Sequence, residues 1–321
     1  MAARVEASEV APRGGLLRQR FADARASLRS AGVELLHDRA GLFGLVVIVL
    51  LVLVAVFAPL IAPHDPSAQS LFDRLTPPFQ TWSYPLGTDA LGRDELSRLI
   101  YGSRVSLEIG VLVVLIAGTS GTILGLLAGY FGGKADTLVM RIVDTQIAFP
   151  GLLLALLIIA VIGPSLKALV IVLSIDGWMV YARVTRGVTA SLRKAPYIEA
   201  AEIVGCRSRR VIFRHVLPNL TSPILTLCVL EFARIILAEA ALSFLGLGIQ
   251  PPDVSWGLML SDGADYLFSA WWVVSLPGIA IALVVLGINL FASWLRVVSD
   301  PHQRDKRFAG AAQVVGPTGV T

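Results

Sequence analysis

Residues 109–133 read IGVLVVLIAGTSGTILGLLAGYFGG, twenty-five consecutive residues without a charged side chain. A helix that crosses a bilayer needs about 20 predominantly apolar residues, so this stretch predicts a membrane span. Within it, small residues recur every four positions, at Ala117, Gly121, Gly125, Gly129 and Gly133. At 3.6 residues per turn they share one face of a helix, where a second helix can pack at close range.

The rest of the chain has the composition of an integral membrane protein. Hydrophobic residues make up 55% of it and charged residues only 16%, a balance that no soluble domain of this length would carry on its surface. Three more uninterrupted apolar stretches lie at 40–63, 145–166 and 266–295, and two stretches with ionisable residues lie at 168–182 and 215–252. Pro150 is expected to kink the third span. We predict an all-α, polytopic membrane protein with six transmembrane helices.

The distribution of Lys and Arg predicts the orientation, because basic loops stay in the cytoplasm. Twenty-one basic residues fall in the segment before the first span, the segment around Lys134 and Arg141, the loop 183–214 and the tail from Arg296, whereas five fall on the opposite side. Both termini are therefore predicted to be cytoplasmic. The formal net charge of +4 follows from this rule, and no aromatic-interleaved basic patch indicates nucleic acid.

The most basic loop carries a distinctive stretch. Residues 199–205 read EAAEIVG, and residues 215–219 read HVLPN. An Ala-Ala pair on a short helix offers a flat surface of small side chains, Gly205 lets the backbone turn, and Pro218 is suited to the start of the next helix. The pattern fits a docking element, and from local composition it also fits an amphipathic surface hairpin.

This spacing resembles the EAA loop of ABC importer permeases, in which the loop forms a coupling helix that seats in a cleft of the ATPase subunit. Two further stretches resemble the dipeptide/oligopeptide/nickel branch of that family: residues 86–98, with Leu-Gly-Thr-Asp, Gly-Arg-Asp and Ser-Arg, and residues 238–248, AEAALSFLGLG. The likeness covers about residues 40–300 and indicates the second, DppC/OppC-like permease subunit. Ala292 and Ser293 depart from the Gly and Asp that are more usual there.

The resemblance implies a type I ABC importer transmembrane-domain fold. It divides the chain into a cytoplasmic segment 1–39, a first transmembrane helix 40–63, an extracytoplasmic segment 64–104, a five-helix permease core 105–298 with a cytoplasmic coupling loop 184–219, and a cytoplasmic tail 299–321. The residues that it assigns to ATPase coupling are Glu199, Ala200, Ala201, Gly205, His215, Leu217 and Pro218.

The resemblance also implies partners and a location. The expected partners are a second homologous permease subunit, two ABC ATPase subunits, an extracytoplasmic solute-binding protein and membrane lipid. ATP and Mg would be bound by the ATPases, with no cofactor on this chain. The protein would lie in the bacterial cytoplasmic (inner) membrane and import di- or oligopeptides or a related small solute.

Ionisable residues inside a span are costly unless they are paired or face water. Glu231 and Arg234 are three residues apart, so they are expected to pair on one helix face, with a pathway-lining role as the alternative. Glu239 lies near the outer end of the same span and is expected to contact the partner permease or the substrate gate. Asp144 and Asp176 lie near the ends of spans and are expected to be hydrated.

Catalysis finds little support in the sequence. The four histidines lie in separate regions, and HExxH and Gly-x-Ser-x-Gly motifs do not occur. Nor does the sequence contain a Walker A motif or a metal-binding pattern, so an ATPase would have to be another polypeptide. The alternatives are a secondary transporter or channel without ATPase partners, which would need matching halves that the chain does not display, and an intramembrane enzyme.

Overall fold

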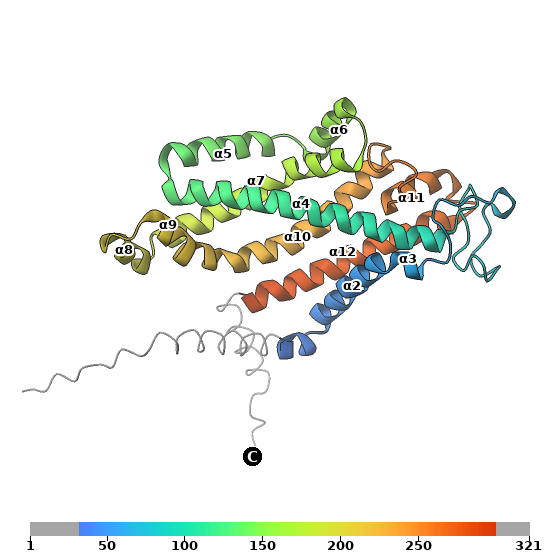
Figure 1. Cartoon of the computed structure of the whole chain (residues 1–321), viewed down its shortest axis with the longest axis horizontal. Coiled ribbons are helices and arrows are strands. Elements are labelled where there is room, and N and C mark those ends of the chain that lie inside the picture. The colour runs from blue at the N-terminus through green and yellow to red at the C-terminus, as the bar shows by residue number, and fades with distance from the viewer. Residues whose placement is uncertain (1–31, 300–321) are drawn as a thin grey trace, which may run out of the picture.

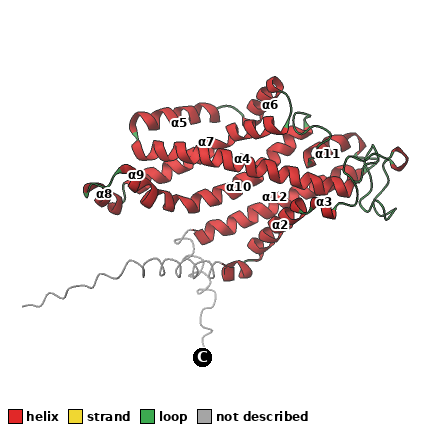
Figure 2. Ribbon diagram, viewed as in Figure 1, coloured by secondary structure: helices red, strands yellow, loops and turns green. Residues whose placement is uncertain are grey.

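The computed structural model describes residues 32–299, and in this part of the chain the regular elements are helices (Figures 1 and 2). They are α2 (Arg39–Val56), α3 (Ala58–Ile61), η1 (Leu71–Asp73), α4 (Glu95–Phe131), α5 (Gly133–Ile147), α6 (Gly151–Ile162), α7 (Leu166–Arg193), α8 (Pro196–Ile203), α9 (Ser208–Val211), η2 (Ile212–Val216), α10 (Leu217–Phe244), α11 (Trp256–Gly263), η3 (Ala264–Tyr266) and α12 (Trp271–Ser299). Most of the predicted segments 1–39 and 299–321 lie outside the described residues.

The predicted all-helical polytopic fold is confirmed. Within the described residues, α2, α4, α7 and α12 are long and apolar enough to cross a membrane, and the bent pair α5 and α6 would make a fifth span. The remaining long helix, α10, has 28 residues and so extends about 42 Å, more than the hydrocarbon thickness of a bilayer. This helix carries Glu231, Arg234 and Glu239 and is not among those five, so the count of six spans stays a prediction.

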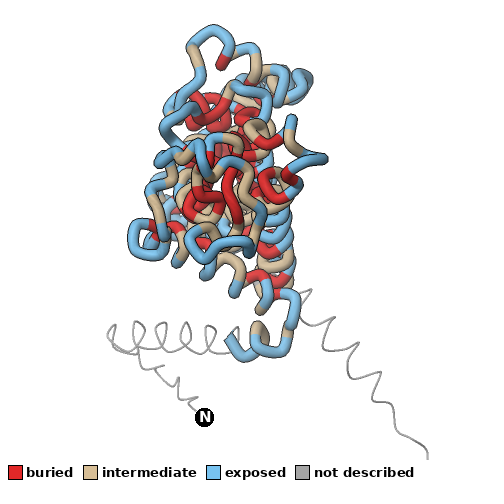
Figure 3. The backbone as a smooth tube through the Cα atoms, turned by 90° about the vertical axis from the view of Figure 1, so that its right-hand side faces the viewer, coloured by how far each residue is buried: buried red, intermediate tan, exposed pale blue. Residues whose placement is uncertain are grey.

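The long helices lie side by side in one bundle (Figure 1). The last turn of α4, the last turn of α7 and the first turn of α10 meet at the end where α8 and α9 project, whereas residues 64–94 and α11 cover the opposite end. Buried residues gather in the middle of the bundle and exposed ones surround them (Figure 3). Because much of that exposed outer surface is Leu, Ile, Val and Phe, its surroundings are the apolar tails of lipid.

Helices α4 and α7 pack at backbone distance through the stripe of small residues. A Cβ atom at Gly121 or Gly125 would overlap the carbonyl oxygen of Trp178 or Ala182, and one at Gly129 would lie 2.6 Å from the carbonyl oxygen of Arg186. The predicted close packing is confirmed for these three glycines. It is wrong for Gly133, which lies beyond the end of α4 at a φ of +55° and has no neighbour within 4 Å of its hypothetical Cβ.

The predicted span at 145–166 is not one kinked helix. Helix α5 ends at Ile147, Pro150 is extended and precedes α6, and the two helix axes differ by 87°. A proline ring lacks an N–H and disfavours the helical conformation in the residue before it, which accounts for a full break at this position.

Residues 86–98 close the end of the bundle opposite α8. The Arg93 guanidinium lies 2.8 Å from the Asp262 carboxylate, and that of Arg98 lies 3.1 Å from it, so the segment is tied to α11. Asp94 caps α4 by accepting a hydrogen bond from the Ser97 N–H at 3.1 Å. Helix α4 continues across residue 104, the predicted boundary between the extracytoplasmic segment and the permease core.

The α4–α7 contact predicts a sharp difference between two glycines. Gly125→Ala should lower the apparent Tm of the detergent-solubilised protein by several degrees, because overpacking costs about 1–3 kcal/mol. Gly187→Ala on α7 is the matched control, since nothing lies within 4 Å of the added methyl group. Fluorescence-detected size-exclusion chromatography after heating measures both, and equal Tm values for the two variants would contradict the assigned contact.

Candidate coupling site

Helix α8 presents the Glu-Ala-Ala stretch beyond the end of the bundle (Figure 1). It begins at Pro196, whose fixed φ and missing N–H suit the first position of a helix. Glu199 and Ala200 are exposed and Ala201 is half-buried, whereas Ile198 is fully buried. One anchoring side chain therefore holds the helix while small residues remain on its surface.

Gly205 ends α8 in a backbone conformation that favours glycine. Its φ is +83°, the Cys206 N–H donates to the Ala201 carbonyl at 3.0 Å, and the Gly205 N–H donates to the Glu202 carbonyl at 2.9 Å. This pair of hydrogen bonds is a Schellman motif, which satisfies the last carbonyl groups of a helix. Gly205 thus fixes the direction in which the chain leaves α8.

A buried apolar cluster, which we call the loop cluster, connects the projecting elements to the bundle. Its members come from α4, α8, α9, η2 and α10: Leu126, Tyr130, Ile198, Val211, Ile212, Val216 and Leu220. Each of these residues is less than 9% exposed. Burial of apolar side chains contributes about 1.5–3 kcal/mol each, so the loop is packed onto the bundle as part of it.

Polar contacts reinforce the loop cluster at Tyr130. Its hydroxyl lies 3.1 Å from a Glu202 carboxylate oxygen, so α8 is tied to the end of α4. The Arg193 guanidinium donates to the Tyr130 carbonyl oxygen and lies 5.5 Å from the centre of the Tyr130 ring. The ends of α4, α7 and α8 are therefore held together through one tyrosine.

His215 and Leu217 lie at a widened helical turn, and Pro218 follows it. The turn η2 is π-helical, with the Leu217 N–H donating to the Ile212 carbonyl oxygen. In a regular α-helix the ring of Pro218 would collide with the carbonyl group four residues earlier, and the wider turn accommodates it. The His215 ring centroid lies 6.5 Å from that of Tyr197, which places the two halves of the motif beside each other.

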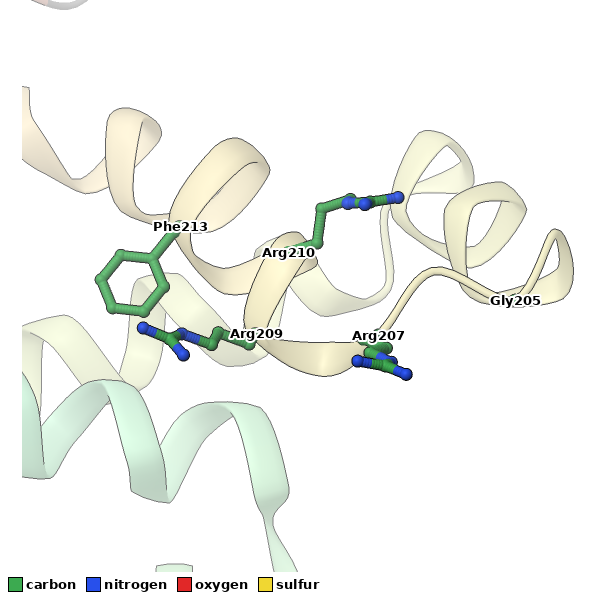
Figure 4. A pocket seen from close by; sticks show the side chains of 5 residues that line it. All are labelled: Gly205, Arg207, Arg209, Arg210 and Phe213. Carbon is green, nitrogen blue, oxygen red and sulfur yellow. The ribbon is translucent and has the colours of Figure 1, made fainter.

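The outer surface of this site is basic. A cavity of about 590 Å³ is lined by Gly205, Arg207, Arg209, Arg210 and Phe213. Figure 4 shows the three guanidinium groups spread around α9, with the Phe213 ring beside Arg209. Ile203 and Val204, at 86% and 82% exposure, add an apolar patch at the tip of α8. The surface combines apolar contact area with positive charge, as a protein-docking surface does.

Between α7 and α10, Arg234 joins two carboxylates instead of one, and its own side chain is 42% exposed. Its Nε lies 2.7 Å from Glu231 Oε2, and its Nη1 lies 2.6 Å from Asp176 Oδ2. The expected pair with Glu231 is present in the structure, and α7 supplies a second partner. The expectation that Asp176 lies near a span end is wrong, because this residue is in the middle of α7, where it is 8% exposed and lines an open pocket.

The position of Glu239 corrects another expectation. The side chain is 1% exposed, Ser243 donates to it at 2.7 Å, and Ser106 Oγ of α4 lies 3.5 Å away. This burial contradicts the expected contact with a partner permease, and the alternative role at a substrate gate stays a prediction. Glu239 instead ties α10 to α4.

Two arginines near the end of α7 form ion pairs that the sequence analysis missed. Arg183 lies 2.5 Å from Asp144, and Arg186 lies 2.5 Å from Asp136, so both connect α7 to α5. The side chain of Asp144 is 67% exposed, and it is also paired. The sequence does show acidic residues on α5 and basic residues on α7. Which of them pair could not be predicted, because the pairing depends on how the two helices are arranged.

No group of three or more His, Cys, Asp or Glu residues in the described part of the chain is arranged to hold a metal ion. The candidate coupling residues lie at the α8 end of the bundle, and the Asp176–Arg234–Glu231 cluster lies between α7 and α10. The two sites are connected by α7 and α10, the helices that enter and leave the loop.

Two models of known protein families match the sequence of this chain. Residues 121–305 match the family model described as the binding-protein-dependent transport system inner membrane component, and residues 28–78 match that of the N-terminal TM domain of oligopeptide transport permease C.

Individual relatives are similar over most of their length. The chain is 45% identical to the di/tripeptide transport system permease protein DppC of Pseudomonas aeruginosa, over 84% of this chain and 90% of the relative. It is 41% identical to the dipeptide transport system permease protein DppC of Alkalihalophilus pseudofirmus, over 86% and 90%. It is 40% identical to the glutathione transport system permease protein GsiD of Pectobacterium atrosepticum, over 82% and 85%.

The cap of α8 gives a prediction about Cys206, which adjoins it. Gly205→Ala in a Cys228→Ser background should speed the labelling of Cys206 by a thiol reagent about 5- to 30-fold, because a non-glycine residue at this φ costs about 1–2 kcal/mol. Gly205→Asn should have a smaller effect, since asparagine tolerates the left-handed conformation better. Unchanged labelling in both variants would mean that the cap does not hold the loop.

The triple contact of Arg234 gives a prediction about charge exchange. The double variant Glu231→Arg with Arg234→Glu should not recover the Tm lost in the single variants, because the glutamate introduced at position 234 would face Asp176. Adding Asp176→Asn to the double variant should raise the Tm by relieving that repulsion. Full recovery in the double variant alone would show that Asp176 is unimportant to the cluster.

Proposed function

The chain belongs to the family of binding-protein-dependent transport system inner membrane components, and from this membership we propose that it conducts peptides across the membrane and receives mechanical force from a separate ATPase at α8. It is the transmembrane permease subunit of an ABC importer, and ATP hydrolysis resides in partner subunits. Membership in this family sets aside the alternatives of a secondary transporter, a channel and an intramembrane enzyme.

The proposed substrates are di- and tripeptides or closely related small solutes. Support comes from the names of the relatives, which are transporters of di/tripeptides, dipeptides and glutathione. All three are short molecules with amide bonds, amino groups and carboxylates. The path through this chain must therefore accept a small, charged and strongly hydrated solute.

The proposed assembly follows the family description. A binding-protein-dependent system implies an ATPase, a binding protein and a partner permease. In finer detail, we propose a second homologous permease subunit, two ATPases that bind ATP and Mg, and an extracytoplasmic binding protein. We also propose that both termini and α8 lie in the cytoplasm, because the basic loop residues gather at the α8 end of the bundle.

The proposed coupling residues are the seven assigned by the EAA resemblance. Glu199, Ala200 and Ala201 lie on α8, Gly205 ends it, and the other three lie at or next to η2. The observation that supports coupling most strongly is the combination of an exposed Ala200 with a buried Ile198 on the same short helix. A partner can approach the small side chain closely, while the buried one transmits the load to the loop cluster.

In the proposed mechanism, the loop works as a lever in alternating access. Closure of the ATPases on ATP would displace α8, and the loop cluster would pass that displacement to α4, α7 and α10 together. Because packed interiors resist compression, a small shift at the loop reorients whole helices. The chain thereby performs mechanical work without catalysing a reaction.

This function predicts that Ala200→Arg abolishes transport. The arginine is too large for a close protein contact at an exposed position, so the variant should insert and fold normally yet lose peptide uptake and substrate-stimulated ATP hydrolysis in the assembled complex. Ala200→Ser is the matched control, because its side chain stays small. Both activities are measured in proteoliposomes with the cognate binding protein, and normal uptake by Ala200→Arg would refute coupling through α8.

A further inference from the structure

An open pocket between α6, α7 and α10 lies against the ion cluster. It has a volume of about 520 Å³ and is lined by residues of α6, α7 and α10: Gly151, Leu152, Ala155, Leu173, Asp176, Arg234, Leu237, Ala238 and Ala241. Most of this wall is apolar, and Asp176 and Arg234 supply its charged groups. Small-molecule sites commonly have this make-up, with a few polar groups that fix the orientation of the ligand.

The charges of the cluster do not balance. Asp176 and Glu231 formally contribute two negative charges, and Arg234 contributes one positive charge. An uncompensated charge at membrane depth costs several kcal/mol unless it faces water or a counter-ion. The Arg234 side chain is 42% exposed and Asp176 lines the open pocket, so water or an additional cation can supply this compensation from the pocket.

Asp176 is the group that is positioned to receive this cation. Its Oδ2 is engaged by Arg234, whereas none of the described residues donates a hydrogen bond to its Oδ1. Although the residue is 92% buried, Oδ1 is not among the buried polar atoms that lack both solvent contact and a partner, so it is open to the cavity that the residue lines. An acceptor oxygen thus faces the cavity with its hydrogen-bonding capacity unused.

The break between α5 and α6 makes room for this oxygen. Gly151 is the first residue of α6, and a Cβ atom there would overlap Asp176 Oδ1. The carboxylate therefore sits against the N-terminus of α6, where the helix dipole favours a negative charge. The bend at Pro150, the glycine after it and the buried aspartate form one arrangement that keeps an ionised carboxylate at the cavity wall.

We propose that this cavity is a station on the peptide path and that Asp176 binds the free α-ammonium group of the passing peptide. Arg234 holds Asp176 and Glu231 in place, and the apolar wall accommodates the side chains of the peptide. The inference rests on the proposed peptide transport and adds a recognition site within the permease itself. A cationic side chain from the partner permease would balance the charge in the same way. Cysteine labelling of the pocket distinguishes that side chain from a bound peptide.

The test uses the assembled complex with Ala238→Cys, in a Cys206→Ser and Cys228→Ser background, as a reporter inside the cavity. A neutral, water-soluble methanethiosulfonate reagent should label this cysteine, and L-Ala-L-Ala should slow the labelling at least about tenfold. N-acetyl-L-Ala-L-Ala, which has no ammonium group, should give little protection. Absence of labelling, as expected if the partner subunit fills the cavity, or equal protection by both peptides would overturn the proposal.

Two variants assign the effect to Asp176. Asp176→Asn removes the charge while keeping the shape, and Gly151→Ala keeps the charge but displaces the carboxylate. Both should remove the difference between the two peptides. Asp144→Asn is the matched control, because it makes the same chemical change at an exposed acid of α5, outside the cavity, and should leave that difference intact.

Failure of the Asp176 site can be distinguished from failure of the proposed peptide transport. If Asp176→Asn fails to assemble, Gly151→Ala and the comparison of peptides on the reporter chain still decide the question. Uptake of radiolabelled L-Ala-L-Ala by the unmodified complex tests the proposed function independently. Uptake without ammonium-dependent protection would overturn only the Asp176 site, whereas an unmodified complex that imports no peptide would overturn the proposed function.

Discussion

The backbone contact between α4 and α7 is the constraint on which the rest of the structure depends. In lipid the hydrophobic effect does not drive helices together, so they associate through close packing. The glycines at 121, 125 and 129 let the two backbones come into contact over more than two turns of α4. On α7 the contact runs from Trp178 to Thr189, close to the end of the helix that leads into α8. Asp176 lies two residues before Trp178, so the contact also holds this residue in position.

The coupling loop inherits its rigidity from the same pair of helices. The guanidinium group of Arg193, at the end of α7, lies over the ring of Tyr130, at the end of α4. Glu202 of α8 contacts the hydroxyl group of the same tyrosine. The loop is thus attached to the most tightly packed part of the bundle. A force applied at α8 meets a stiff base, and this is what distinguishes a lever from a flexible connection.

The sequence predicted what depends on local periodicity and missed what depends on tertiary arrangement. The small-residue stripe, the helical character and the glycine turn at 205 follow from spacing and from residue type. The complete break at Pro150 could not be distinguished from a kink, because both begin with the same missing hydrogen bond. The contact between Asp176 and Arg234 spans 58 residues, and the burial of Glu239 depends on a serine of α4, so neither is encoded in any local pattern.

The charged cluster and the loop lie on the same two helices, and this would connect the proposed recognition with the proposed coupling. Asp176 lies on α7, Arg234 lies on α10, and the loop that joins α7 to α10 carries α8. A displacement of α8 that separates these helices must lengthen the contact between Arg234 and Asp176, while one that closes them must shorten it. Since ion-pair energy depends on distance, the proposed affinity of the pocket for a cation would change with the position of the loop. A path that must bind its solute on one side and release it on the other requires such a change.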